Sequence, residues 1–140
     1  MIEFEATAEV PVPAERAWAV VADYARDAEW RAQVVSMQPS PPGLAHPGQR
    51  TAEVMRFAGR TLRNDGEVVT GDGTRFTWRT TTGVDAEGAR EVRPLAPDRC
   101  RITLHTRVRP TGAERYYAPL ARFVLERGLR KDLRRLVELL

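Results

Sequence analysis

The stretch from Thr111 to Leu140 most constrains how this chain can fold, because only this apolar repeat is long enough for a helix of many turns. Its stripe recurs at helical spacing, with arginines and glutamates between its members. The positions of the stripe are Leu120, Val124, Leu125, Gly128, Leu129, Leu133, Leu136, Val137 and Leu140. Toward Tyr117 the apolar residues occupy a different side of the helix from those around Leu133, which suits a helix lying across a twisted sheet. We therefore expect a long C-terminal helix around which a sheet wraps.

Most of the chain before this helix is typical of strands. Ile2–Val10 alternates apolar and polar residues, as a strand does when one face meets water. Prolines end this strand, and two short helical segments follow, at Ala14–Tyr24 and Ala25–Trp30. Another strand begins at Val34, and the turn-forming residues Pro39–Gly43 close it.

From Gly48 onward, turn signals recur at short intervals and divide the sequence into further strands. The predicted strands are Arg50–Ala58, Arg60–Thr70, Thr74–Thr82, Gly88–Leu95 and Arg99–Arg109. Short connections between successive strands require antiparallel neighbours. The sequence has no strand–helix–strand repeat and no glycine-rich nucleotide-binding motif. The order is one strand, two short helices, about six more strands and a long helix, which predicts an α+β helix-grip fold.

Composition limits the classes of function. A chain of 140 residues is long enough for one domain. No apolar run approaches the roughly 20 residues that span a bilayer, and no leader pattern opens the chain, so we expect a cytoplasmic protein. Cys100 has no partner for an internal disulfide, and with two histidines it offers no metal set, so neither metal nor cofactor is expected. The arginines are scattered among acids, which argues against a nucleic-acid partner.

Two segments resemble a known family. Val10–Trp30 (VPVPAERAWAVVADYARDAEW) runs from a strand through a proline-containing turn into a helix with an aromatic residue at Trp18, and ends on a second tryptophan. The closing segment RGLRKDLRRLVELL resembles the C-terminal helix of the same family. The positions that fit the strands between them are Gly48, Gly59, Pro94 and Cys100–Ile102. Over essentially its whole length the chain resembles the START-like superfamily, also called Bet v 1-like or SRPBCC, and particularly its polyketide cyclase/dehydrase-type members.

The resemblance implies one START-like domain over residues 1–140, built on a seven-stranded antiparallel curved sheet around the long C-terminal helix. It also implies a cavity between sheet and helix for an apolar or amphipathic small molecule. Members include lipid and sterol carriers, hormone receptors and aromatase/cyclases of polyketide pathways. A fold shared by so many activities does not choose among them.

Strand alternation predicts which side chains line such a cavity. The apolar face of each strand opposes a face rich in arginine, so the apolar faces should be turned toward the helix. The predicted lining is Trp30, Met55, Phe57, Leu62, Phe76, Trp78, Thr80, Ile102, Leu104, Thr106, Tyr117, Leu120, Val124 and Gly128. Trp30 either gates the mouth or caps the core, and Trp78 is more typical of core. Gly128 either leaves volume or lets a strand come close.

Four polar residues are candidates for chemistry. Glu53 and Asn64 fall on inward faces, where polar groups are costly unless they are paired or wetted. In the functional interpretation, Glu53 orients a ligand or acts as a general base, and Asn64 is its hydrogen-bond partner. In the alternative, Glu53 reaches water near the end of its strand or pairs with an arginine. Arg90 could meet an anionic ligand, although a salt-bridged surface position is favoured. Tyr117 could offer its hydroxyl group, although packing is the commoner role.

Three hypotheses of function follow. The first is binding of a hydrophobic or amphipathic molecule, lipid-like or polyketide-like, in an internal cavity between the sheet and the C-terminal helix. The second is an enzyme, a polyketide aromatase/cyclase or dehydratase, whose cavity folds a reactive chain while polar residues handle protons. The third is a non-catalytic interaction module that uses Tyr116 and Phe123 as an exposed patch. Both a monomer and a homodimer are compatible with the sequence.

Overall fold

A computed structural model describes residues 1–110 and 116–140 of the chain. Its elements in chain order are β1 (Ile2–Val10), α1 (Ala14–Val21), the 3-10 turn η1 (Tyr24–Arg26), α2 (Asp27–Trp30), β2 (Val34–Ser40), β3 (Arg50–Phe57), β4 (Arg60–Gly71), β5 (Arg75–Thr80), β6 (Ala86–Ala96), β7 (Arg99–Val108) and α3 (Ala118–Glu138). The boundaries of β1 are as predicted, and β6 is longer at both ends than expected. Of the segment predicted as helix, residues 111–115 lie outside the described part.

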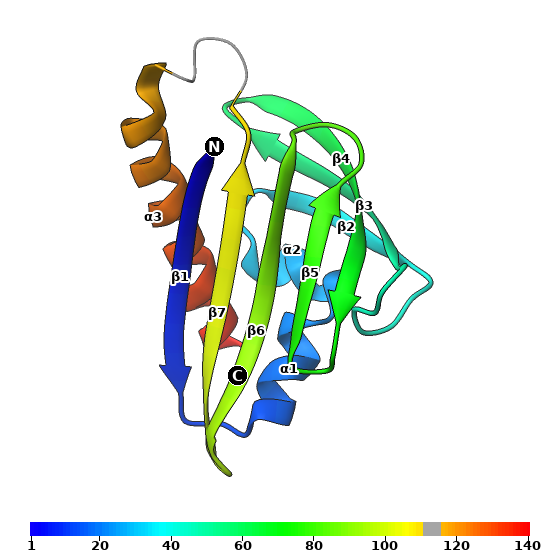
Figure 1. Ribbon diagram of the computed structural model, residues 1–140, viewed down its shortest axis with the longest axis vertical. Coiled ribbons are helices and arrows are strands. Elements are labelled where there is room, and N and C mark those ends of the chain that lie inside the picture. The colour runs from blue at the N-terminus through cyan, green and yellow to red at the C-terminus, as the bar shows by residue number, and fades with distance from the viewer. Residues whose placement is uncertain (111–115) are drawn as a thin grey trace.

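The seven strands form one sheet in the order β1-β7-β6-β5-β4-β3-β2, and each neighbouring pair is antiparallel. The sheet curls, with α3 beside its β1 edge, α1 at the lower end and α2 at about mid-height behind the strands (Figure 1). Register shifts between Val34 and Ser36 and between Val68 and Thr70 mark bulges, which bend a sheet and increase its twist. The predicted α+β helix-grip fold, with two short helices after the first strand, is confirmed.

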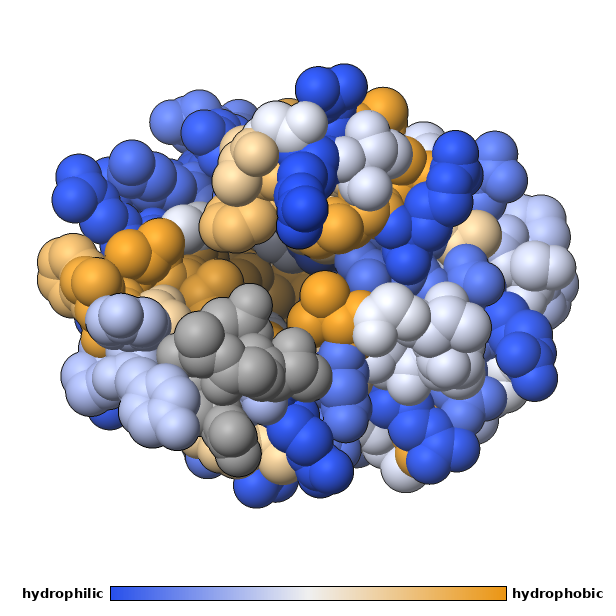
Figure 2. All heavy atoms as spheres, turned by 90° about the horizontal axis from the view of Figure 1, so that it is seen from above, coloured by the Kyte–Doolittle hydropathy of each residue, from blue (hydrophilic) through white to orange (hydrophobic). Residues whose placement is uncertain are grey.

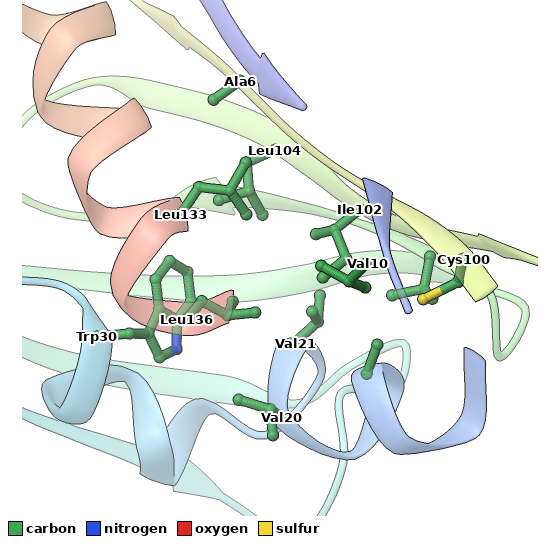
Figure 3. Close-up of a cluster of buried hydrophobic side chains, with 12 residues drawn as sticks. Ala6, Val10, Val20, Val21, Trp30, Cys100, Ile102, Leu104, Leu133 and Leu136 are labelled. Carbon is green, nitrogen blue, oxygen red and sulfur yellow. The ribbon is translucent and has the colours of Figure 1, made fainter. Parts of the chain in front are cut away.

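The core joins the second half of α3 to the sheet and to the short helices. Leu133 and Leu136 lie close to Leu104 of β7 and Trp30 of α2 (Figure 3). The buried cluster comprises Ala6, Val10, Ala17, Val20, Val21, Trp30, Val92, Cys100, Ile102, Leu104, Leu133 and Leu136. Burying one large apolar side chain contributes about 1.5–3 kcal/mol, so this cluster anchors the helix.

The first half of α3 is not packed in this way. Leu120 is 62% exposed and Val124 is 51% exposed, whereas Leu136 is 0% exposed. Among the described residues α3 makes its main contacts with β1 and α2. A Cβ placed at Gly128 would meet no described atom within 4 Å, so of the two alternatives for Gly128 the close approach of a strand does not hold. The fully buried contacts of α3 therefore lie in its second half.

A second buried cluster joins the end of α1 and η1 to strands β2, β4 and β5. Its members are Ala22, Tyr24, Val34, Met37, Val68 and Phe76. Phe76 meets the rings of Tyr24 and Trp18 edge to face, with centroids 5.6 and 6.0 Å apart.

Within the described ranges, no helix is both long and apolar enough to span a membrane.

Candidate functional site

The upper end of the molecule is hollowed and apolar. Figure 2 views this end and shows hydrophobic side chains gathered around a hollow. Four parts of the fold lie at this end: the start of α3, the start of β1, the end of β7 and the β5–β6 connection (Figure 1). The β4–β5 register places the β3–β4 hairpin beyond the same end. The exposed large apolar side chains of these elements are Phe57, Val84, Tyr116, Tyr117, Leu120, Phe123 and Val124.

The predicted lining residues fall into three groups by burial. The buried ones are Trp30, Phe76, Ile102 and Leu104. The partly buried ones are Met55, Leu62, Trp78, Thr80 and Thr106. The exposed ones are Phe57, Tyr117, Leu120, Val124 and Gly128. Trp30, at 2% exposure, therefore caps the core and does not gate a mouth. The partly buried residues share the inward face with Phe76 and Leu104, so the concave side is where they meet solvent.

Trp78 forms a shelf on this concave side. It pairs across the sheet with Gly88 of β6. A Cβ at Gly88 would stand 2.7 Å from Cζ2 and 2.9 Å from Cε2 of the indole, and would also meet the carbonyl oxygen of His105. The indole therefore lies over the β6 backbone, in space that only a glycine leaves free. Since Trp78 is only partly buried, part of its ring remains available for contact with a planar molecule.

Arg90 is sealed beneath this surface. Its Nη1 donates to Asp27 Oδ1 at 2.9 Å and its Nη2 to Asp27 Oδ2 at 2.7 Å, and Nη1 also donates to the carbonyl oxygen of Val21 at 3.1 Å. The guanidinium carbon lies 4.7 Å from the centroid of the Tyr24 ring and 5.0 Å from that of Trp30. Burial alone would lower the pKa of Arg90, but the charge and hydrogen bonds of Asp27 outweigh it and raise the pKa.

The surface position favoured for Arg90 from the sequence is therefore wrong. Arg90 is 6% exposed and Asp27 is 0% exposed. The physical reason is the counterion, because a bidentate carboxylate on α2 compensates the guanidinium inside the protein. Burial also raises the pKa of the nearby Tyr24 hydroxyl group far above its usual value. With both terminal nitrogens occupied, Arg90 has a structural role.

A second, more open network adjoins the first. Arg31 Nη1 donates to Asp27 Oδ2 at 3.1 Å and to Glu53 Oε2 at 2.7 Å. Asn64, the cross-strand neighbour of Glu53, donates through Nδ2 to Glu53 Oε1 at 3.2 Å. Asn64 Oδ1 in turn accepts the backbone N–H of Val84 at 3.0 Å. Glu53 thus has both an arginine and an asparagine as partners, two alternatives that the sequence had set against each other.

Asp27 and Arg31 were not recognised from the sequence. Their spacing of four residues, typical of ion pairs on one helical turn, was the available signal. Together they link the sealed pair to Glu53, whose side chain is 12% exposed, and Arg31 itself is 23% exposed. A chain of polar contacts therefore runs from the core toward the concave side of the sheet.

Asp132 ties α3 to the same region. Its Oδ1 accepts the backbone N–H of Ala32 at 3.2 Å and a hydrogen bond from Arg135 Nη1 at 3.1 Å. Burial raises the pKa of Asp132, although the hydrogen bond from Ala32 and the charges of Arg31 and Arg135 oppose this. The contact holds the second half of α3 next to the residue that follows Arg31.

The remaining candidates are not brought to this network. Tyr117 is 64% exposed at the N-terminal cap of α3. Tyr116 and Phe123 are 79% and 61% exposed, as a surface patch requires. No group of three metal-ligating side chains occurs within residues 1–110 and 116–140.

Comparison with known proteins gives a family and a fold. A family model described as "Polyketide cyclase / dehydrase and lipid transport" matches residues 1–140. No curated protein matches the chain in sequence. Among solved structures, the protein TTHA0849 from Thermus thermophilus superimposes with a TM-score of 0.81 at 20% identity, covering 97% of this chain and 94% of that one.

Two further structures carry descriptive titles. The Zhui aromatase/cyclase from Streptomyces sp. R1128 has a TM-score of 0.78 at 18% identity, covering 97% of this chain and 91% of that one. A START superfamily protein from Mycobacterium smegmatis has a TM-score of 0.71 at 20% identity, covering 99% of this chain and 98% of that one. At such identities the likeness establishes the START-like fold and leaves the ligand open.

Proposed function

The chain belongs to the polyketide cyclase / dehydrase and lipid transport family, and from that premise we propose that it binds a hydrophobic or amphipathic small molecule between the sheet and the first half of α3. One observation carries the proposal. Apolar side chains on the concave face, such as Met55 and Leu62, are only partly buried, and Leu120 and Val124 of α3 are exposed. Covering such surface stabilises a complex by roughly 25 cal/mol per Å².

The polar groups support an amphipathic ligand. Binding sites are mostly apolar with a few fixed polar groups that orient the ligand. Here the Trp78 indole and Met55 supply apolar surface, and Arg31, Glu53 and Asn64 supply hydrogen-bonding groups on the concave side. A ligand would place its apolar part along Trp78 and its polar part against Glu53.

Titration with the uncharged fluorescent probe N-phenyl-1-naphthylamine tests this proposal. Leu62 faces inward and is partly buried, whereas the adjacent Arg63 faces outward and is exposed. Leu62→Glu should raise the Kd of the probe by about tenfold or more, because a carboxylate would then stand in the apolar part of the site. Arg63→Glu should leave the Kd unchanged. Absence of probe binding, or equal effects of the two substitutions, would contradict the proposal.

A cyclase or dehydratase activity is the second candidate, and the contact between Glu53 and Arg31 at 2.7 Å favours it. A carboxylate can accept a proton from a carbon between two carbonyl groups, and an adjacent guanidinium can stabilise the resulting enolate oxygen. Arg90 is excluded from this role by its pairing with Asp27. Incubation with a thioester-linked poly-β-ketone should give cyclised product with the native protein and far less with Glu53→Gln. Equal product from both proteins would remove this candidate.

A further inference from the structure

The polar network on the concave side is balanced in charge. It contains the cations Arg31 and Arg90 and the anions Asp27 and Glu53, joined by ion pairs of 2.7 to 3.1 Å. The adjoining Asp132 has Arg135 as its own partner. A carboxylate or phosphate entering this site would add an anion without a free cation to meet it. In a partly dry environment such a charge is strongly unfavourable.

The same network has unused hydrogen-bonding capacity. Among the described residues Arg31 donates only through Nη1, which leaves the N–H groups of Nη2 and Nε without a protein acceptor. Each oxygen of Glu53 accepts one hydrogen bond, and a carboxylate oxygen can accept two. Both side chains retain some exposure, 23% for Arg31 and 12% for Glu53.

Donor and acceptor therefore stand side by side. A hydroxyl group is the simplest partner for such a pair, because it accepts one hydrogen bond while it donates another. A carbonyl group would use only the donors of Arg31, and a carboxylate would use the donors while facing the carboxylate of Glu53. The arrangement thus distinguishes oxygen functions by charge and by donor capacity.

We propose that the hollow selects an uncharged apolar molecule that carries a hydroxyl group, held between Arg31 and Glu53, and that it discriminates against carboxylates of the same shape. The inference rests on the proposed small-molecule binding and adds the chemical class of the ligand. Such a ligand is a phenol, an enol or an alcohol on an apolar frame. A fatty acid is not in this class.

Three probes with the same ring system test the inference by isothermal titration near neutral pH: 2-naphthol, 2-naphthoate and naphthalene. 2-Naphthol is uncharged and 2-naphthoate is anionic under this condition. The native protein should bind 2-naphthol about tenfold more tightly than 2-naphthoate, because the hydroxyl group brings no charge to the site. It should also bind 2-naphthol more tightly than naphthalene, which makes no hydrogen bond to Arg31 or Glu53.

Glu53→Gln sharpens the test, because it removes one negative charge at nearly constant shape. The affinity for 2-naphthoate should then rise and that for 2-naphthol should fall, which reverses or levels the preference. Glu67→Gln is the matched control, since Glu67 pairs with Arg79 on the outer side of β4 and its substitution should leave the preference unchanged.

The outcomes separate this inference from the proposal beneath it. If the native protein binds 2-naphthoate as tightly as 2-naphthol, the charge selection is wrong while binding in the hollow stands. An unchanged preference in a folded Glu53→Gln variant equally overturns it. If none of the three probes binds, the proposed small-molecule function is contradicted, and so is the inference that rests on it. The comparison on the native protein needs no variant, so a variant that does not fold leaves the test intact.

Discussion

The two halves of α3 carry one apolar stripe but meet different surroundings. In the second half, Leu133 and Leu136 are 3% and 0% exposed, because Trp30 and Leu104 lie opposite them. In the first half, Leu120 is 62% exposed. A helix can therefore be anchored by part of its apolar stripe and leave the rest exposed, because tertiary packing of one segment suffices to hold it.

The polar groups repeat this contrast. Arg90 and Asp27 are buried, and both terminal nitrogens of Arg90 are engaged. Arg31 and Glu53 are partly exposed and have spare hydrogen-bonding capacity. The sealed pair is thus suited to stability and the open pair to recognition. The difference can be tested by breaking each side separately.

The largest effect is expected from Asp27→Ala. It would leave the buried guanidinium of Arg90 without its counterion, and removing one partner of a buried ion pair costs about 3–5 kcal/mol of unfolding free energy. Urea denaturation measures this loss. The control is Glu29→Ala, which breaks the exposed pair with Arg26 and should leave the free energy of unfolding nearly unchanged, because water screens that pair. Similar losses in the two variants would show that Arg90 is not sealed.

Leucine truncation compares the two halves of α3 directly. Leu136→Ala should lower the free energy of unfolding by about 2–5 kcal/mol, because it opens a cavity in the core. Leu120→Ala should change it by about 0.5 kcal/mol or less, yet weaken binding of N-phenyl-1-naphthylamine. If Leu120→Ala were as destabilising as Leu136→Ala, the first half of the helix would be packed after all.

Two glycine substitutions should change the free energy of unfolding in opposite directions. Gly88→Ala places a Cβ against the carbonyl oxygen of His105 and against the Trp78 indole, and should cost about 1–3 kcal/mol while weakening probe binding. Gly128→Ala meets open space in a helix and should stabilise the protein by about 1 kcal/mol. Thermal and urea denaturation check both. A stabilising Gly88→Ala would show that β7 and the indole do not approach Gly88 so closely.

The smallest effect concerns Asp132. Because burial raises its pKa, the folded protein holds this proton more readily than the unfolded chain does. The residue should therefore make the native protein less stable relative to Asp132→Asn as the pH rises above the ordinary aspartate value of 3.8. Urea denaturation of both proteins across the acidic range measures the difference. A native protein that gains stability relative to Asp132→Asn over this range would contradict the assignment.

Local patterns were sufficient to predict most of the fold. The alternation in Ile2–Val10 and the helical stripe in the C-terminal segment each reflect a single period of side-chain direction. The inward direction of Glu53 and Asn64 followed from the same alternation, and the two side chains do meet. What could not be predicted was the half-packed helix, because the path of α3 over the sheet depends on contacts between distant segments.

The buried ion pair could not be predicted either, because it also depends on contacts between distant segments. Asp27 and Arg90 are 63 residues apart in the chain. Alternation places Arg90 on the same face as Val92 and opposite to the exposed Arg93, but nothing local indicates the carboxylate that compensates it. Trp30 was equally ambiguous, because a tryptophan after a short helix suits a gate as well as a core. The position of Leu136 beside Trp30 shows that Trp30 belongs to the core (Figure 3).

The indole N–H signals of Trp18, Trp30 and Trp78 in a ¹⁵N-labelled sample provide the most direct test of the central claim, that the open half of the concave face binds small molecules. On titration with 2-naphthol, the Trp78 signal should shift the most, because its ring forms the shelf, and the buried Trp30 signal should stay nearly fixed. A shift confined to Trp30, or no shift at any of the three, would contradict the account.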